Sequence, residues 1–220
     1  MDNKEELIKE LIRGGILRSK KVIDAMLKVP RELFVPEELR KYAYLDTPLP
    51  IGYGQTISAP HMVALMTEAL DPDRGDRILE VGTGSGYQAA ILAEIVGPEG
   101  HVYTVEIIKE LVEFARTNLM RAGYLDRVTI IHGDGSLGYE EAAPYDKIIV
   151  TAAAPRIPQP LIDQLKPGGR LVIPVGDFHI QYLTIVSKEV DGRVRYETSI
   201  PCIFVPLVGK YGVRASSGLT

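Results

Sequence analysis

Apolar residues recur at intervals of three and four along the first 75 residues, which is the spacing of one helix face. This pattern predicts a helix that ends at Gly14-Gly15, a second helix for which Ser19 can be the N-cap, and a third over about 61–70. Prolines between residues 30 and 50 predict an extended, irregular passage between the second and third helices. We therefore expect this segment to be mostly helical.

Between residues 76 and 176, short apolar runs alternate with longer stretches at helical spacing. The predicted strands are RILEVG, HVYTVE, RVTIIHGDG, KIIVTAA and RLVIPVG, and the predicted helices are YQAAILAEIV, KELVEFARTNLMRAG and LIDQL. Strands that alternate with helices form parallel βαβ units, which here imply a doubly wound sheet with helices on both faces.

After residue 180 two further apolar runs flank Asp191-Gly192, a strong hairpin signal. YLTIVSKEV and VRYETSIPCIFVPL are predicted antiparallel strands at one edge of the sheet. The expected fold class is α/β: a doubly wound, mostly parallel seven-stranded sheet with an N-terminal helical extension and an antiparallel C-terminal edge. We divide the chain into residues 1–75, 76–207 and a tail of 208–220, whose last residues, RASSGLT, are expected to be loose.

Composition and charge exclude several classes of protein. The chain has 220 residues and a net charge of −4 without a basic block, so we expect no nucleic acid partner. Cys202 is the single cysteine, which excludes an internal disulfide and a thiolate metal cluster. The sequence shows no signal peptide and no apolar run of about 20 residues. We expect a cytoplasmic monomer without a membrane partner, and the scarcity of Asn and Gln favours a heat-adapted, thermostable protein.

The loop EVGTGSGYQ at residues 80–88 follows a predicted strand and opens a helix, as a nucleotide-binding turn does. Its glycines are spaced G-x-G-x-G, whereas the dinucleotide fingerprint is G-x-G-x-x-G. No phosphate-binding P-loop occurs in the sequence. Taken alone, the loop could also be a tight turn with a purely structural role.

Three acids at the ends of three predicted strands narrow the choice: Glu80, Glu106 and Asp134. Glu106 lies 24 residues after Gly82, where an acid accepts hydrogen bonds from two ribose hydroxyls. Asp134 could accept a bond from an adenine amino group. Each acid alone could be a cap, but together they line the crevice where such sheets bind ligands. An acid-lined pocket repels a pyrophosphate and suits the ammonium and sulfonium of S-adenosylmethionine.

The E-x-G-x-G-x-G loop, the strand-two acid, the GD pair and LKPGGRLVIPVG together resemble class I S-adenosylmethionine-dependent methyltransferases over about residues 76–176. The resemblance implies S-adenosyl-L-methionine as cofactor, S-adenosyl-L-homocysteine as product, and no metal. It also implies that the loop contacts the methionine part, the strand-two acid the ribose and the GD aspartate the adenine.

A narrower resemblance lies in YGQTISAPHM (53–62), VPRELFVP (29–36) and IFVPL (203–207), which are similar to the protein-L-isoaspartate (D-aspartate) O-methyltransferases. It covers nearly the whole chain. It implies a repair enzyme that methylates the free carboxylate of L-isoaspartyl and D-aspartyl residues in damaged proteins, leading to a succinimide and restored aspartate. The cofactor-binding residues expected are Gln55, Thr56, Ile57, His61, Glu80, Gly82, Thr83, Gly84, Ser85, Gly86, Glu106, Ile107, Asp134 and Gly135. The substrate-binding residues expected are Thr56, Ile57, Ser58, Val205, Pro206 and Leu207.

A carboxylate is ionised at neutral pH, so the acceptor needs no general base. We expect Ser58, at the catalytic position, to orient the carboxylate with its hydroxyl; the alternative is an N-cap of the third helix. His61 is expected to position the cofactor, with a structural hydrogen bond as the alternative. The segment 205–207 is expected to pair with substrate main chain, unless it is an ordinary buried strand.

Three other functions remain open on the sequence alone. Another class I methyltransferase, acting on a small molecule or RNA, would have no reason to carry GQTISAPHM. The glycine spacing disfavours a nicotinamide-dependent oxidoreductase. The intact loop and acids disfavour a non-catalytic protein-binding module.

Overall fold

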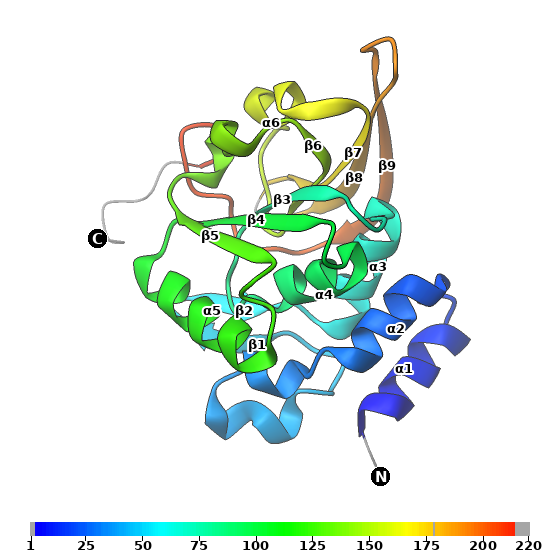
Figure 1. Ribbon diagram of the computed structural model, residues 1–220, viewed down its shortest axis with the longest axis vertical. Helices are drawn as coiled ribbons and strands as arrows, with labels where there is room; N and C mark the ends of the chain where they lie inside the picture. The colour runs from blue at the N-terminus through cyan, green and yellow to red at the C-terminus, as the bar shows by residue number, and fades with distance from the viewer. Residues whose placement is uncertain (1–2, 178, 214–220) are drawn as a thin grey trace.

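The structure is a computed structural model that describes residues 3–177 and 179–213. Seven strands form one sheet in the order β5-β4-β3-β6-β7-β8-β9 (Figure 1). The strands are β3 (Arg77–Val81), β4 (His101–Glu106), β5 (Val128–His132), β6 (Tyr145–Val150), β7 (Leu165–Gly176), β8 (Gln181–Lys188) and β9 (Val194–Cys202). Strands β3 to β7 are parallel, and β8 and β9 are antiparallel to their neighbours. This arrangement confirms the predicted fold class.

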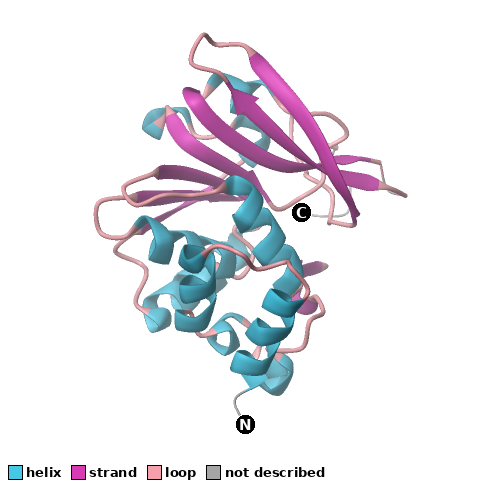
Figure 2. Ribbon diagram, turned by 90° about the vertical axis from the view of Figure 1, so that its right-hand side faces the viewer, coloured by secondary structure: helices cyan, strands magenta, loops and turns pink. Residues whose placement is uncertain are grey.

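The sheet separates two hydrophobic layers because successive strand residues point to opposite faces. On one face lie the helices α1 (Asn3–Arg13), α2 (Lys20–Lys28), α3 (Pro60–Leu70), α4 (Tyr87–Val96) and α5 (Lys109–Ala122). On the other lies α6 (Gln159–Asp163), with the short 3-10 turns η3 (Gly135–Leu137) and η4 (Glu140–Ala142) nearby. Ile78 packs in the first layer and its neighbour Leu79 in the second. Figure 2 shows the helical layer against the sheet.

The N-terminal helices share one core with the sheet. Met26 of α2 and Met66 of α3 lie in the same buried cluster as Ile149 and Val172 of the central strands. Arg170 adds a hydrogen bond of 3.0 Å to the carbonyl oxygen of Ala69. Residues 3–75 are therefore packed as a layer of the main body.

In the N-terminal segment, the prediction of an extended passage was wrong, and that of Ser19 as N-cap was confirmed in position but not in its hydrogen bond. The proline-rich passage contains the 3-10 turns η1 (Arg31–Phe34) and η2 (Glu37–Tyr42) and a small antiparallel hairpin, β1 (Leu49–Gly52) with β2 (Gln55–Ile57). Ser19 is at the N-cap position of α2, but its hydroxyl makes no capping hydrogen bond and is buried without a partner. Instead, the Glu68 carboxylate accepts from the backbone N–H groups of Arg18 and Ser19, each at 2.8 Å.

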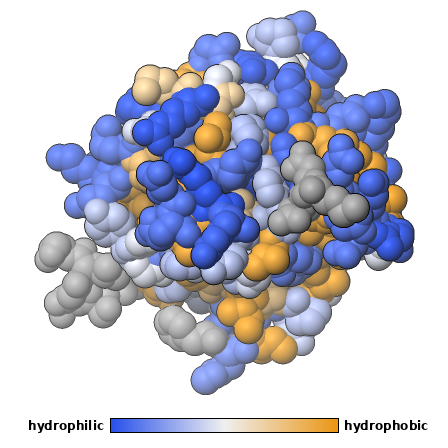
Figure 3. Space-filling model, turned by 90° about the horizontal axis from the view of Figure 1, so that it is seen from below, coloured by the Kyte–Doolittle hydropathy of each residue, from blue (hydrophilic) through white to orange (hydrophobic). Residues whose placement is uncertain are grey.

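The C-terminal edge also differs from the sequence prediction. Strand β9 ends at Cys202, so residues 203–207 leave the sheet edge and reach Ala153 beside the carboxyl ends of the central strands. RASSGLT (214–220) lies outside the described residues. No described helix is long and apolar enough to cross a membrane. The face in Figure 3 is largely hydrophilic, with smaller apolar patches between.

Candidate functional site

Two adjoining cavities lie where the parallel strands end. The larger has a volume of about 550 Å³ and the smaller about 50 Å³. Both are bordered by Thr56, Gly82, Gly84 and Thr151, so they meet at the glycine loop. The larger extends toward β4 and the segment 205–208, and the smaller lies between the loop, β2 and α3. We call them the larger and the smaller cavity.

The glycine loop bends sharply between β3 and α4. Gly82, Gly84 and Gly86 have φ angles of 95°, 53° and 86°, a region that favours glycine. At Gly82 a Cβ atom would lie 2.6 Å from the hydroxyl oxygen of Thr151, so both the angle and the space require glycine. Helix α5 supports the turn from behind, because Asn118 donates a hydrogen bond of 3.0 Å to the carbonyl of Ser85.

Glu80 is the last acid before the loop and is fully buried in the wall of the smaller cavity. One carboxylate oxygen accepts a 2.5 Å hydrogen bond from Thr104, whose hydroxyl is in turn 2.7 Å from that of Thr83. The other oxygen has no hydrogen-bond partner within the described part of the chain. Burial raises the pKa of Glu80 to about 8, and the nearby charge of Glu106 adds to the rise. This carboxyl group therefore has an acceptor available for a cation.

Glu106 ends β4 and lies in the wall of the larger cavity. Its carboxylate accepts hydrogen bonds from the backbone N–H groups of Gly84 at 2.9 Å and Ile108 at 3.0 Å. Each oxygen of a carboxylate can accept a second hydrogen bond. The bond to Gly84 thus fixes the acid against the glycine loop while leaving acceptor capacity on both oxygens.

Asp134 is held by the C-terminal tail. One oxygen accepts from the backbone N–H of Ser136 at 2.9 Å and from its hydroxyl at 2.6 Å, and the other accepts from the N–H of Lys210 at 2.7 Å. The N–H of Tyr211 donates to the Ser136 hydroxyl at 3.0 Å. A Cβ atom on Gly209 would lie 2.0 Å from Asp134. Asp134 itself lines neither cavity, whereas its neighbour Gly135 lines the larger one.

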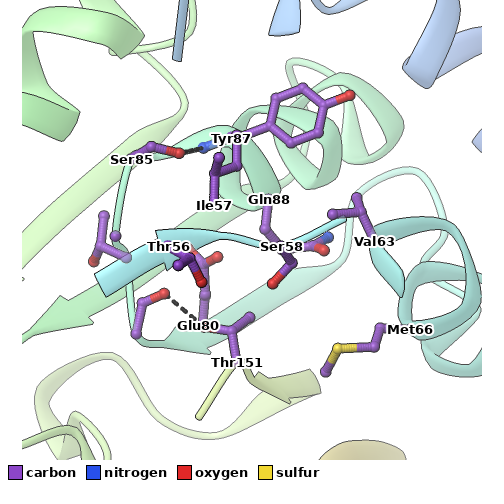
Figure 4. A pocket seen from close by; sticks show the side chains of 13 residues that line it. Thr56, Ile57, Ser58, Val63, Met66, Glu80, Ser85, Tyr87, Gln88 and Thr151 are labelled. Atoms are coloured by element: carbon purple, nitrogen blue, oxygen red, sulfur yellow. Dashed lines mark hydrogen bonds between the residues drawn. The ribbon is translucent and has the colours of Figure 1, made fainter. Parts of the chain in front are cut away.

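The hairpin β1–β2 forms the wall opposite the loop. Thr56 borders both cavities, Gln55 the larger one, and Ile57 and Ser58 the smaller one. Figure 4 shows the side chains of Thr56, Ser58, Glu80 and Thr151 around one space, with Met66 and Val63 at its apolar side. Ser58 is not the N-cap of α3: that position is Ala59. The alternative reading of Ser58 as a helix cap is therefore wrong.

His61 lies beside the site but lines neither cavity. Its Nδ1 is 2.9 Å from the Asp46 carboxylate, which also accepts from the His61 backbone N–H at 2.8 Å. Asp46 thereby satisfies one of the free N–H groups at the start of α3. This pairing is the structural hydrogen bond considered as the alternative for His61.

The segment 205–207 forms the outer wall of the larger cavity. Ala153 donates to the carbonyl of Val205 and accepts from the N–H of Leu207, both at 2.8 Å. Pro206, between them, is exposed, while Leu207 is buried. The segment is thus a single isolated bridge with one free side, not an ordinary buried strand.

Sequence reasoning missed many of the wall residues, among them Thr151 and Tyr53. Thr151, at the end of β6, borders both cavities, and its hydroxyl donates a 2.7 Å hydrogen bond to the carbonyl of Gly82. Its position at the carboxyl end of the strand KIIVTAA was the available signal. Tyr53, at the tip of the missed β1–β2 hairpin, borders the larger cavity.

The walls fit S-adenosylmethionine better than a phosphate-bearing nucleotide. Glu80, Glu106 and Glu110 line the cavities, against Lys109 as the only lysine or arginine among the described wall residues. The unpartnered, fully buried oxygen of Glu80 is matched by a cationic ligand and not by an anion. Among the described residues, no group of three His, Cys, Asp or Glu side chains could hold a metal ion.

Comparisons with known proteins agree with this geometry. The family model of protein-L-isoaspartate (D-aspartate) O-methyltransferase matches residues 2–212. The protein-L-isoaspartate O-methyltransferase of Hyperthermus butylicus is 63% identical, over 96% of this chain and 90% of that one; that of Staphylothermus marinus is 58% identical, over 96% of both. These relatives come from thermophiles, in keeping with the composition.

A solved structure supports the same assignment. It is described as a protein-L-isoaspartate O-methyltransferase from Plasmodium falciparum in complex with S-adenosyl-L-homocysteine. It superposes with a TM-score of 0.83 at 31% identity and covers 94% of this chain and 99% of that one. The fold, the acid-lined cavities and the match over nearly every residue lead to one conclusion: this chain belongs to the protein-L-isoaspartate O-methyltransferase family, whose members use S-adenosyl-L-methionine to methylate isoaspartyl residues.

Proposed function

We propose that the larger cavity holds the adenosyl part of S-adenosyl-L-methionine and the smaller cavity its methionine part. The free acceptor capacity of Glu106 suits two ribose hydroxyls, and the unpartnered oxygen of Glu80 suits a cation. The glycine loop from Gly82 to Gly86 lets the ligand approach the backbone. Ile107 and Gly135 line the larger cavity beside the adenosyl part, and Gln55 and Thr56 close it from the hairpin side.

Asp134 has a supporting role in this proposal. One of its oxygens already accepts two hydrogen bonds within the described chain, whereas the other accepts one and can accept one more. We propose that Asp134 holds Gly135 in place and thereby positions the edge of the adenine. His61, paired with Asp46, holds the start of α3 in place behind the cofactor site and does not act as a base.

We assign the orientation of the acceptor carboxylate to Ser58, together with the backbone of Thr56 and Ile57. Ser58 lines the smaller cavity, and its hydroxyl has no capping duty in the structure that would compete. When bound, the cofactor supplies an electrophilic methyl group on a sulfonium. A bond forms from a carboxylate oxygen to that carbon as the carbon–sulfur bond breaks, giving a methyl ester and S-adenosyl-L-homocysteine.

The residues of this chain contribute alignment and exclusion of water, because no proton has to move. Orienting two reacting groups can lower a barrier by roughly 7–11 kcal/mol. The reaction joins an anion and a cation into neutral products, so a site that excludes water favours it. The apolar side chains of Val63 and Met66, which border the smaller cavity, serve that end.

The substrate main chain is proposed to lie along the free side of Val205-Pro206-Leu207. Proline cannot donate, so the Pro206 carbonyl is the acceptor that this segment offers on that side. Contact through the main chain needs no particular substrate side chains, which suits an enzyme that meets many damaged sequences. We extend the proposal to D-aspartyl residues and to collapse of the ester to a succinimide that hydrolyses partly to aspartate.

The observation that carries the proposal is the meeting of the two cavities at Thr56, Gly82, Gly84 and Thr151, beside Ser58. The test is methyl transfer from labelled cofactor to an isoaspartyl peptide, its aspartyl twin and its D-aspartyl twin. Transfer to the first and third alone supports the proposal. Equal labelling of the aspartyl twin contradicts the proposal. The proposal is also contradicted if substitutions at this meeting point leave transfer to the isoaspartyl peptide intact and only distant substitutions abolish it.

We further propose that the enzyme works as a cytoplasmic monomer. The single cysteine offers no internal disulfide to an oxidising compartment. In the same proposal, residues 1–75 cover the site, 76–207 bind the cofactor, and Lys210 and Tyr211 of the tail 208–220 hold Asp134 and Ser136. Light scattering after size exclusion tests the monomer, which an obligate dimer would contradict.

A further inference from the structure

Arg31, the first residue of η1, is the largest of the fully buried side chains among the residues that the structure describes. It belongs to the VPRELFVP segment, whose resemblance to the family pointed to no role. Charged side chains are seldom fully buried unless they are paired. The burial of this guanidinium therefore needs an explanation.

The contacts of Arg31 lead to the wall of the smaller cavity. Its Nη2 donates a 2.7 Å hydrogen bond to the carbonyl oxygen of Ser58, and its Nε donates one of 2.8 Å to the carbonyl of Ala43. The guanidinium carbon lies 4.9 Å from the ring centre of Tyr87. Ser58 and Tyr87 both line the smaller cavity, so the guanidinium lies directly behind that wall.

No carboxylate of the described residues pairs directly with this charge. Arg31 takes part in no salt bridge with any described residue, and its Nη1 is buried without a hydrogen-bond partner. Asp46 is the carboxylate that acts on it through space, and its own closest partner is His61. Loss of solvation lowers the pKa of Arg31, which is the sign of a charge held at a cost. An apolar side chain of similar volume would fill this space without that cost.

We propose that Arg31 is a positioning residue for the methyl acceptor: it fixes Ser58 from behind and supplies a positive charge without a direct ion-pair partner, which the substrate carboxylate matches. The inference rests on the proposed role of Ser58. The 2.7 Å bond sets the plane of the peptide that follows Ser58, and the charge polarises that peptide. The acceptor carboxylate then completes an ion pair across the wall, in surroundings where charges are poorly screened.

The test compares three substitutions in the full-length enzyme. Arg31→Met removes the charge and the donors, Arg31→Gln keeps an amide donor without charge, and Arg31→Lys keeps the charge without the planar fork. For Arg31→Met we expect kcat/KM for an isoaspartyl peptide to fall 30- to 300-fold. The dissociation constant for S-adenosyl-L-homocysteine, measured by calorimetry, should stay within threefold. Arg31→Lys should recover a large part of the loss and Arg31→Gln little.

Phe34→Leu is the matched control. Phe34 lies in the same turn, is fully buried, and packs against the same Tyr87 ring at 5.5 Å, but it makes no hydrogen bond to Ser58. We expect it to lower the melting temperature and leave both kcat/KM and cofactor affinity near the parent values. If Arg31 served folding alone, Arg31→Met would resemble Phe34→Leu: a lower melting temperature with kcat/KM and cofactor affinity near the parent values.

A second measurement isolates the charge. The probes are an isoaspartyl peptide and the same peptide with that carboxylate as a primary amide, and their dissociation constants are compared in the presence of S-adenosyl-L-homocysteine. The parent enzyme and Arg31→Lys should prefer the carboxylate at least tenfold, and Arg31→Met should show a ratio near one. This readout does not depend on turnover.

Two results overturn the inference. One is a folded Arg31→Met variant with unchanged kcat/KM; the other is an unchanged carboxylate preference in that variant. If Arg31→Met does not fold, Arg31→Gln decides by the same two readouts. Ser58→Ala in the same assays separates the two proposals. Normal turnover of Ser58→Ala contradicts the proposed role of Ser58. Reduced turnover of Ser58→Ala together with normal turnover of Arg31→Met contradicts the role of Arg31 alone.

Discussion

The buried carboxyl group of Glu80 predicts that cofactor binding releases a proton. With its pKa near 8, Glu80 is protonated at pH 6.5 in the ligand-free protein. A cation held at its free oxygen favours the ionised form, so the proton leaves on binding. Below pH 8 the affinity for S-adenosyl-L-homocysteine, which keeps the ammonium, should therefore rise with pH. The expected slope approaches tenfold per pH unit between pH 5.5 and 7.5.

The raised pKa of Glu80 also lowers the free energy of unfolding of the ligand-free protein, and proton linkage gives the pH range in which it does so. The unfolded carboxyl group ionises near 4.5 and the folded one near 8, so folding takes up a proton between those values. Below pH 4.5 Glu80 does not lower the free energy of unfolding, and its destabilising effect grows as the pH rises toward 8. At 1.36 kcal/mol per pH unit, the loss reaches about 5 kcal/mol at pH 8. Glu80→Gln, which cannot ionise, should therefore stabilise the ligand-free protein at pH 7 by about 3 kcal/mol.

Calorimetry in two buffers of different ionisation enthalpy measures the proton directly. The parent enzyme should release close to one proton per ligand at pH 6.5, and Glu80→Gln should lose that release and bind more weakly. His132 also lines the larger cavity, so His132→Gln is the control and should keep the release. Equal proton release by the parent and Glu80→Gln would refute this account of Glu80.

Three further predictions concern the rest of the site. Glu106→Gln should weaken S-adenosyl-L-homocysteine binding about 10- to 100-fold, since bonds to a charged acceptor contribute roughly 1.5–3 kcal/mol; unchanged calorimetric affinity would remove Glu106 from the site. Ser58→Ala should lower kcat at least about tenfold while cofactor affinity stays within twofold, because the hydroxyl is assigned to the acceptor; initial rates on an isoaspartyl peptide test this. Gly82→Ala should abolish cofactor binding and lower stability by about 1–3 kcal/mol, because the angle and Thr151 both exclude a Cβ atom; a variant with normal melting temperature and affinity would contradict the close packing there.

The regular part of the fold could be predicted from the sequence because its signals are local. The run HVYTVE and the helix over YQAAILAEIV were predicted with the bounds that the structure has for β4 and α4. The helix lies between Gly86 and Gly97, the strand begins directly after Gly100, and each has one clear period. The hairpin at residues 49–57 was missed because its strands are short and one begins beside prolines, which are typical of irregular chain.

Contacts between distant residues could not be predicted from spacing. The predicted strand 194–207 ends early because Val205 and Leu207 pair with Ala153, about 50 residues away in the sequence. Asp134 could be placed at a strand end, but not its bonds to Ser136 and to the tail. Arg31 went unexplained for the same reason, since its partner Ser58 is 27 residues further on.

The attachment of residues 209–211 to Asp134 and Ser136 means that the cleft is completed by a segment that follows the last strand of the sheet. A chain that stopped at Leu207 would keep every strand and helix of the central body. It would lack the main-chain donors of Lys210 and Tyr211 that engage Asp134 and Ser136. Cleavage by a protease in this stretch would thus leave the melting temperature nearly unchanged, while Asp134 and Ser136 at the adenine end lost their main-chain partners. A thermal unfolding assay would therefore not detect such damage to the repair enzyme itself.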